Sequence, residues 1–190
     1  MAPAADGRCA SLRVMIDHVG KPIALIGLMG SGKSAVAREI GERLGTSVAD
    51  LDALIESEEG RPIARLFERE GEPWFRRREG VALDQALGAG ARVIACGGGI
   101  VLSAAHCRVL RERCWTVWLE VAPAEAAARL AGETEARPLL AGADPAARLA
   151  ELLDARAPRY AATADLRVDT SGRAPGAIAD EIIAAWRGAV

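Results

Sequence analysis

Residues 27–34 constrain the fold of this chain more than any other stretch, because they read GLMGSGKS and fit the pattern G-x-x-x-x-G-K-[ST]. An apolar run at 23–26 predicts a strand before them, and 35–44 has the apolar spacing of a helix. In a strand–loop–helix context, backbone N–H groups and the helix N-terminus hold phosphate oxygens. A glycine-rich turn that fits the pattern by accident would lack that context. The stretch therefore predicts a site for a nucleoside triphosphate.

Two side chains of this loop carry specific chemistry. Only Lys21 and Lys33 are lysines among 24 basic residues, so an arginine-rich chain keeps a lysine where the pattern requires one. A compact ammonium reaches between the β- and γ-phosphates, where a planar guanidinium fits poorly. The hydroxyl of Ser34 can coordinate Mg²⁺. We expect the nucleotide to be held by Gly30, Ser31, Gly32, Lys33, Ser34 and Ala35.

Composition excludes several classes of protein. The chain has 190 residues, of which 51% are hydrophobic, and this suits one domain with a substantial core. A net charge of −2 and only four Trp, two Phe and one Tyr argue against a nucleic-acid-binding protein. No apolar run has transmembrane length, and charged residues interrupt the first 20 residues, so we expect no membrane association and no signal peptide. The four cysteines lack a metal-ligand spacing and are expected to pack in a cytoplasmic protein.

Five strand patterns alternate with helical patterns, at 23–26, 47–50, 92–96, 115–121 and 166–169. This alternation predicts a three-layer α/β fold, a five-stranded parallel sheet with right-handed crossovers and helices on both faces. Residues 132–145 contain several glycines and prolines and have the length of a mobile lid. We expect a single domain over 21–190 and a flexible extension over 1–20, within which Met15 could be the true start.

Two carboxylates lie where the second strand ends, and ligands of such sheets bind beyond the carboxyl ends of the strands. Asp50 and Asp52 are two residues apart, and side chains at that spacing on an extended segment point the same way. Both could face the γ-phosphate, one helping to hold Mg²⁺ and the other accepting the proton of the attacking hydroxyl. Alternatively, Asp52 only caps a helix that begins near Ala53.

Other residues at this edge of the sheet are ambiguous. The run Gly-Gly-Gly at 97–99 can expose backbone N–H groups to a ligand, although a flexible turn would have the same sequence. Arg76 has glutamates at i−4 and i+3, which fits either surface ion pairs or a brace for a substrate-binding guanidinium. The charge pattern alone favours the surface for Arg76. Arg137 and Arg156 raise the same question, because a lone arginine is usually exposed.

In their order and spacing, these elements resemble the shikimate kinase family over nearly the whole chain from Ile23 onward. The shared elements are the loop 27–34, Asp50-x-Asp52, Gly60-Arg-x-Ile63 with Phe67, Gly71-Glu72-x-x-Phe75-Arg76-x-x-Glu79, Gly97–Gly99, the lid sequence Arg137-Pro-Leu-Leu140, Arg156-x-Pro158-x-Tyr160 and Val168-Asp-Thr170. Each is weak alone, but together they are highly specific. The resemblance implies a P-loop kinase fold and transfer of the ATP γ-phosphate to the 3-hydroxyl of shikimate, giving shikimate 3-phosphate and ADP on the route to chorismate and the aromatic amino acids.

For the acceptor, the resemblance implies four kinds of contact. Arg76 and Arg156 would clamp the shikimate carboxylate, a planar anion that matches the guanidinium fork. Asp52 would bind the ring hydroxyls and serve as the candidate base. Gly98 and Gly99 would offer backbone donors.

For the nucleotide, the resemblance implies that Lys33 stabilises charge on the transferred phosphoryl group. Ser34 would ligate Mg²⁺, and Asp50 would hold the metal through water. Arg137 would move in with the lid as an arginine finger supplied by the chain itself. Lid closure would exclude water, whose attack on ATP would otherwise compete with transfer. The partners implied are ATP and shikimate, and the implied state is a monomer.

Some positions depart from the family pattern. Family members often carry an arginine seven residues before the lid arginine, where it stacks on adenine; this chain has Leu130 there and Arg129 one residue earlier. The sequence therefore leaves the adenine-stacking residue open. The lid also contains Glu133 and Glu135 where a more basic loop would be usual, which could alter lid closure or nucleotide affinity.

Alternative functions remain on the same scaffold. A kinase for gluconate or a nucleoside monophosphate would share the phosphate loop, but it would not need the pair Arg76 and Arg156. A GTP-binding switch requires N-K-x-D, and the chain has no asparagine. A catalytically silent nucleotide-binding module would be expected to lose Lys33, Asp52 or Arg137, and all three are present.

Overall fold

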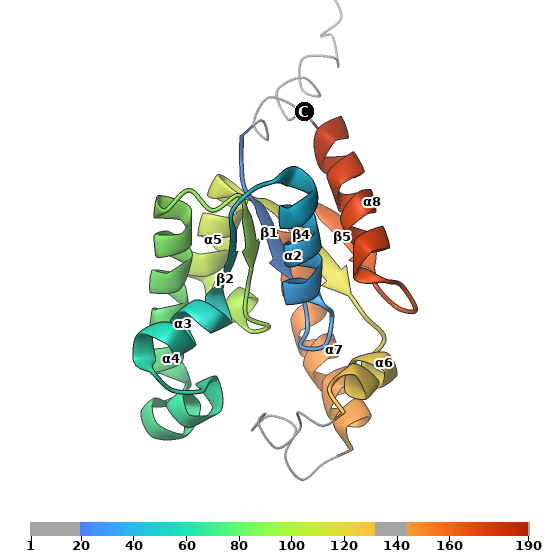
Figure 1. Cartoon of the computed structure of the whole chain (residues 1–190). Helices are drawn as coiled ribbons and strands as arrows, with labels where there is room; N and C mark the ends of the chain where they lie inside the picture. The colour runs from blue at the N-terminus through green and yellow to red at the C-terminus, as the bar shows by residue number, and fades with distance from the viewer. Residues whose placement is uncertain (1–19, 132–143, 190) are drawn as a thin grey trace, which may run out of the picture.

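The fold is organised around one parallel β-sheet (Figure 1), as seen in a computed structural model that describes residues 20–131 and 144–189. Its strands are β1 (Ile23–Ile26), β2 (Val48–Asp50), β3 (Val93–Ala95), β4 (Trp115–Glu120) and β5 (Leu166–Asp169). They lie in the order β2-β3-β1-β4-β5, and every pairing is parallel. The sheet therefore reverses its winding direction next to β1, and the loop after β1 opens at that point.

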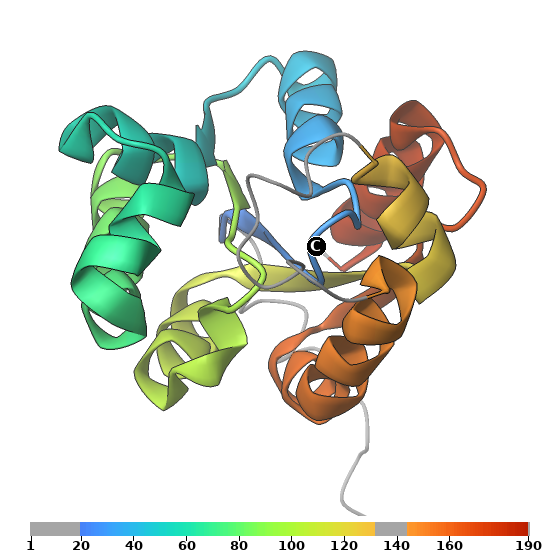
Figure 2. The same cartoon turned by 90° about the horizontal axis from the view of Figure 1, so that it is seen from below.

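Each face of the sheet is covered by helices. The helical elements are α2 (Lys33–Leu44), α3 (Leu51–Glu59), α4 (Ile63–Gly88), a 3₁₀ turn η1 (Ile100–Leu102), α5 (Ala104–Arg113), α6 (Pro123–Arg129), α7 (Pro145–Thr163) and α8 (Pro175–Gly188). Helices α2 and α8 pack on one face, and α3, α4, α5 and α7 pack on the other. Figure 2 shows this layering along the sheet, with α6 beside α7.

The central strand explains why both layers are needed. In β1, Ile23 and Leu25 belong to the core shared with α2 and α8, whereas Ala24 and Ile26 belong to the core on the opposite face. None of the four is more than 1% exposed. A strand buried on both faces has a continuous apolar sequence, and successive side chains point to opposite faces.

These observations confirm the predicted three-layer α/β fold with five parallel strands. Some boundaries differ from the prediction. The helix after the phosphate loop begins at Lys33 rather than at residue 35, and the third strand covers Val93–Ala95. The helical region before it is interrupted twice, between α3 and α4 at Gly60 and within α4 at Gly71, whose φ of 77° lies outside the helical range.

Two predicted segments lie mostly outside the described residues. They are the extension, of which residues 1–19 are outside, and the lid, of which 132–143 are outside. The last two lid positions are described: Asp144 caps α7 and Pro145 begins it. Within 20–131 and 144–189, no helix is long and apolar enough to cross a membrane.

Replacing Leu25 by alanine is expected to lower the free energy of unfolding by about 2–5 kcal/mol, because the side chain is completely buried in the central strand. Val81→Ala is the matched control, since Val81 is 42% exposed and its truncation should change stability by less than about 0.5 kcal/mol. Urea denaturation measures both values. Equal losses in the two variants would contradict this description of the core.

Candidate functional site

The loop between β1 and α2 has a backbone that requires glycine at two positions. Gly27 has a φ of 142°, and a β-carbon there would overlap the carbonyl oxygen of Leu119. Gly30 has a φ of 78°, and its β-carbon would lie 2.8 Å from the carbonyl oxygen of Ala126. Neither position can accept a side chain without moving β4 or α6. The glycines therefore keep the loop close to the neighbouring elements.

This loop ends at a helix N-terminus that is suited to anions. The residue that caps α2 is Gly32, which offers no side-chain acceptor, and the first turn contains no acidic residue. The first N–H groups of α2 therefore remain available for a ligand, at the positive end of the helix dipole. Lys33 folds back over the loop, where its Nζ donates to the carbonyl oxygens of Gly27 at 3.0 Å and Leu28 at 2.9 Å. Its ammonium is thus held beside the predicted phosphate positions.

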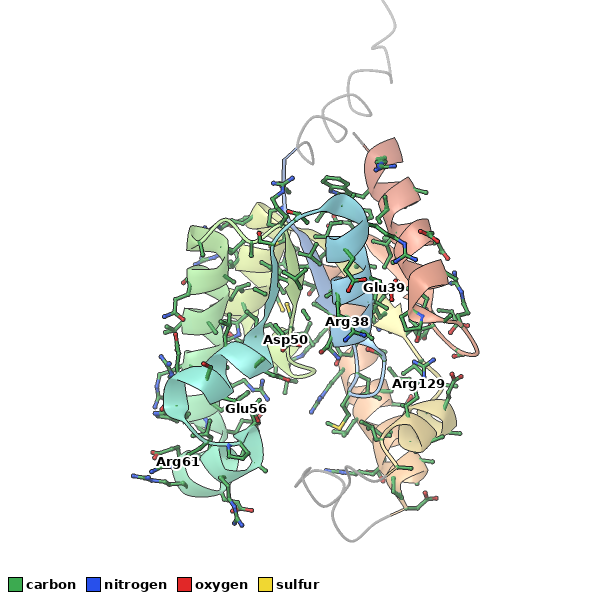
Figure 3. The ribbon with its side chains drawn as sticks, in the orientation of Figure 1. Arg38, Glu39, Asp50, Glu56, Arg61 and Arg129 are labelled. Atoms are coloured by element: carbon green, nitrogen blue, oxygen red, sulfur yellow. The ribbon has the colours of Figure 1, made fainter. Side chains whose placement is uncertain are left out.

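Asp50 connects the loop to the end of β2. Its Oδ2 accepts a hydrogen bond from Ser34 Oγ at 2.5 Å, and its Oδ1 accepts from the backbone N–H groups of Asp52 and Ala53. Asp50 is therefore the N-cap of α3, which begins at Leu51. The alternative that Asp52 caps a helix starting near Ala53 was wrong. In Figure 3, Asp50 and Arg129 lie on either side of the loop that follows β1.

The hydroxyl of Ser34 and the carboxylate of Asp50 together offer two oxygen ligands of the kind that magnesium prefers. Among the described residues, no cluster of three or more His, Cys, Asp or Glu could hold a metal on its own. Mg²⁺ usually keeps several waters and is bound through one or two protein oxygens together with substrate phosphates. These two oxygen ligands therefore fit a magnesium ion that binds together with a nucleotide.

Asp52 faces a different part of the site from Asp50. It lies in the first turn of α3, and a β-carbon added to Gly97 would lie 2.9 Å from its Oδ1. The expectation that both aspartates point the same way assumed an extended segment. The chain becomes helical at Leu51, so Asp50 points to Ser34 while Asp52 points to the glycine run after β3.

Arg76 is braced inside the molecule, so the surface alternative for this residue was wrong. Its side chain is 16% exposed, and its Nη1 donates to Glu79 Oε2 at 2.6 Å. Its Nε and Nη2 both donate to Glu72 Oε1 at 3.2 Å. The guanidinium also lies over the Phe75 ring, 5.4 Å from its centroid. A β-carbon at Gly99 would overlap this guanidinium, so Arg76 lies directly against the glycine run.

Arg156 reaches the same glycine run from α7. It is only 6% exposed, and its Nη1 donates to the carbonyl oxygen of Gly98 at 3.2 Å. Tyr160 OH donates to the same oxygen at 2.5 Å, and burial raises the pKa of this phenol to about 12. A β-carbon at Gly98 would lie 3.3 Å from the backbone nitrogen of Met29. The two arginines and the phosphate loop therefore both contact the glycine run, and only the backbone of that run lies between them.

Glu79 has a degree of burial that could not be seen in the sequence. Its side chain is fully buried, and its Oε1 has no hydrogen-bond partner. Burial raises its pKa to about 7; the Arg76 guanidinium opposes that rise, and the charges of Asp52 and Glu72 add to it. The spacing from Arg76 indicated a possible brace, but burial is a property of the packed fold.

Replacing Glu79 by glutamine is expected to remove a pH dependence of stability. Between the ordinary pKa of 4.5 and the raised value of about 7, folded Glu79 holds a proton that the unfolded chain has released. The contribution of Glu79 to the free energy of unfolding therefore falls as the pH rises through this window, by up to about 1.4 kcal/mol per pH unit. Urea denaturation across the window measures this. A difference between wild type and variant that stays constant with pH would contradict the assignment.

Arg129 lies over the phosphate loop from α6. Its Nη1 donates to the carbonyl oxygen of Gly30 at 3.2 Å, and its Nη2 donates to the carbonyl oxygen of Thr170 at 2.6 Å. Glu125 pairs with the same guanidinium at 2.7 Å. Leu130, the position where family members often have arginine, is 4% exposed and packs with α7 residues.

The structure thus brings most of the predicted site residues to one edge of the sheet. The loop residues Gly30, Ser31, Gly32, Lys33, Ser34 and Ala35 lie beside Asp50, and the second group contains Asp52, Arg76, Gly98, Gly99 and Arg156. The two groups meet where Gly98 approaches Met29 and Gly27. Arg137 lies outside the described residues.

Comparisons of this chain with family sequence models, with related sequences and with solved structures all point to the same family. The sequence model of the shikimate kinase family matches residues 29–187. Shikimate kinase of Symbiobacterium thermophilum is 43% identical over 85% of this chain and 93% of its own length. That of Moorella thermoacetica is 44% identical over 86% and 95%. The structure of Acinetobacter baumannii shikimate kinase in complex with shikimate matches with a TM-score of 0.84 and 34% identity, covering 88% of this chain and 93% of that one.

Proposed function

Because this chain belongs to the shikimate kinase family, we propose that the phosphate loop and the glycine run form the two halves of its active site. As a member of the family, the protein transfers the γ-phosphate of ATP to the 3-hydroxyl of shikimate, giving shikimate 3-phosphate and ADP. The observation that carries the proposal is that two enclosed arginines and a phosphate loop contact one run of three glycines.

The nucleotide half consists of the loop, Lys33, Ser34 and Asp50. The N–H groups of the loop and of the first turn of α2 would bind the phosphate oxygens. Lys33 would exchange its bonds to the carbonyl oxygens of Gly27 and Leu28 for phosphate oxygens. Ser34 and Asp50 would hold Mg²⁺, Asp50 through water. The bound ion would neutralise charge on the β- and γ-phosphates.

The acceptor half consists of Arg76, Arg156, Asp52 and the glycine run. The carboxylate of shikimate is planar and carries one charge, which matches a guanidinium fork. Glu72 and Glu79 hold Arg76 in place, so little side-chain entropy remains to be lost when the carboxylate binds. Asp52 would orient the ring hydroxyls and accept the proton of the attacking 3-hydroxyl. Backbone N–H groups of Gly98 and Gly99 would add hydrogen bonds.

Two further roles rest on the family resemblance. Arg137, with a lid over about 132–145, would close over the nucleotide and stabilise charge on the transferred phosphoryl group. Arg129 is a candidate for the adenine side of the site, because it already contacts Gly30 and Thr170.

We also propose a cytoplasmic monomer. Cys96, Cys107 and Cys114 are free and buried, which suits a reducing compartment. Light scattering of the purified protein would test the monomer.

Arg76→Lys is expected to raise the KM for shikimate at least about tenfold while the KM for ATP changes little. Lysine keeps a positive charge beside Glu79 but cannot bind a carboxylate with a planar fork. Steady-state kinetics with each substrate varied in turn would measure both constants. Arg77→Lys is the matched control, because Arg77 is the next residue on α4 and is exposed. An unchanged KM for shikimate would remove Arg76 from the site.

A further inference from the structure

Two carboxylates brace the guanidinium that is proposed to bind the acceptor, and a third lies beside one of them. Glu72 and Glu79 accept hydrogen bonds from Arg76. Asp52 and Glu79 flank the same backbone position, since a β-carbon at Gly97 would lie 2.9 Å from Asp52 Oδ1 and 2.5 Å from Glu79 Oε1. Glu79 therefore lies between the guanidinium of Arg76 and the carboxylate of Asp52, so its charge state depends on both.

Glu79 is the member of this group that is least able to carry a negative charge. It is fully buried, and only one of its two oxygens is hydrogen-bonded. An unpartnered charged oxygen in the interior costs more free energy than a neutral carboxylic acid, so small changes in nearby charge decide which form is present. The raised pKa of about 7 agrees with this geometry.

We propose that Glu79 is a positioning residue that takes up a proton when the carboxylate of shikimate binds beside Arg76. This inference rests on the proposed function, because it requires the substrate carboxylate to share the Arg76 guanidinium. A further negative charge at this place disfavours the ionised form of Glu79. The proton comes from the buffer and adds to Oε1, the oxygen without a partner, while Oε2 still accepts from Arg76 Nη1.

Proton uptake would have two consequences for the reaction. A neutral Glu79 still holds Arg76 but no longer balances its charge, so more of that charge is available to the substrate carboxylate. The new O–H would also lie beside the carboxylate of Asp52, the candidate base. By linkage, the affinity for shikimate should decrease as the pH rises through the pKa of Glu79.

Other titratable groups face Glu79, and His106 is the main competitor for the proton. Its Nδ1 lies 3.8 Å from Glu79 Oε2 and has no hydrogen-bond partner. Burial and the charge of Arg76 lower the pKa of His106, which makes the imidazole a poor acceptor near neutral pH. Burial raises the pKa of Cys96 and of Tyr160, so both stay neutral. The groups around Glu79 are Arg76 and Glu72 from α4, Asp52 from α3, Cys96 after β3, His106 from α5 and Tyr160 from α7. Three further charged residues act on these neighbours: Lys33 on Cys96, Arg156 on Tyr160, and Asp84 on His106.

The test is calorimetric titration of shikimate into the full chain, near the pKa of Glu79, in buffers of low and high ionisation enthalpy. The dependence of binding enthalpy on buffer gives the number of protons taken up. We expect up to about half a proton per site, because a group at its pKa is already half protonated before binding. Glu79→Gln keeps an acceptor for Arg76 but cannot titrate, so its binding enthalpy should not depend on the buffer.

Two controls assign the proton. Titration with Mg-ATP should show the same buffer dependence in wild type and Glu79→Gln, because the nucleotide half does not include Glu79. His106→Asn should retain the uptake seen with shikimate. The inference is overturned if wild-type binding is independent of the buffer, if Glu79→Gln retains the uptake, or if His106→Asn loses it. Shikimate turnover with buffer-independent binding would contradict this inference alone, whereas absence of both binding and turnover would contradict the proposed function as well.

Discussion

Lys33→Ala is expected to lower kcat by about 10³-fold, the loss that follows removal of one preorganised donor to transition-state charge. The ammonium is held within 3.0 Å of two loop carbonyls, so it stands beside the phosphate positions before the nucleotide arrives. Alanine also removes hydrogen bonds that close the loop, so a moderate rise in the KM for ATP should accompany the lower kcat. Steady-state ADP release measures both constants.

Lys21→Ala is the control for this variant. Lys21 is the other lysine of the chain and lies just before β1, at the end of the sheet opposite the phosphate loop. Its replacement should leave kcat within a factor of about two, because surface substitutions outside a site have small effects. If Lys33→Ala retained wild-type turnover, the loop would not be the site of phosphoryl transfer.

Asp52→Asn is expected to lower kcat by about 10²–10⁴-fold while shikimate still binds. Asparagine keeps the shape and one acceptor oxygen, but it cannot take the proton of the attacking hydroxyl. Asp52 lies in the first turn of α3 against Gly97, and its replacement removes neither partner of the ion pair between Arg76 and Glu79. Kinetics for turnover and calorimetry for shikimate binding separate the two effects.

Asp84→Asn serves as the control, since Asp84 is an exposed residue of α4 that pairs with Arg113 and is not among the proposed site residues. Near-normal turnover of Asp52→Asn would exclude Asp52 as the base. In that case the attacking hydroxyl would lose its proton only after the transition state of phosphoryl transfer, as a loose transition state permits.

The elements of the fold were predictable because they depend on local patterns. The strand at 23–26 is a short apolar run, and the loop after it contains glycines at positions that structurally require them. Alternation of strands and helices then fixes a parallel sheet and the edge at which ligands bind. The position of the phosphate loop follows from these rules alone.

The acceptor half was less predictable from residues alone, because burial depends on distant contacts. Arg76 and Arg156 have the charge pattern of surface residues, yet both are enclosed by packing against the glycine run. The family resemblance, rather than any physical signal along the chain, indicated their role. The directions of Asp50 and Asp52 depended on a helix start that shifted by two residues.

Electrostatic properties were the hardest to anticipate. The raised pKa of Glu79 results from complete burial together with charges contributed by two helices, α3 and α4. A sequence shows that Glu79 can reach Arg76, but it does not show that one oxygen of Glu79 will have no partner. Such properties follow from the packed structure.

The most direct test of the proposed activity is ADP release with Mg-ATP and one acceptor at a time: shikimate, gluconate, nucleoside monophosphates, or none. The structure and the family membership predict rapid release with shikimate and only background release with the others. Background release with shikimate, in folded protein that binds ATP, would contradict the central claim. A response to another acceptor in that same experiment would retain the phosphate loop and reject the arginine clamp.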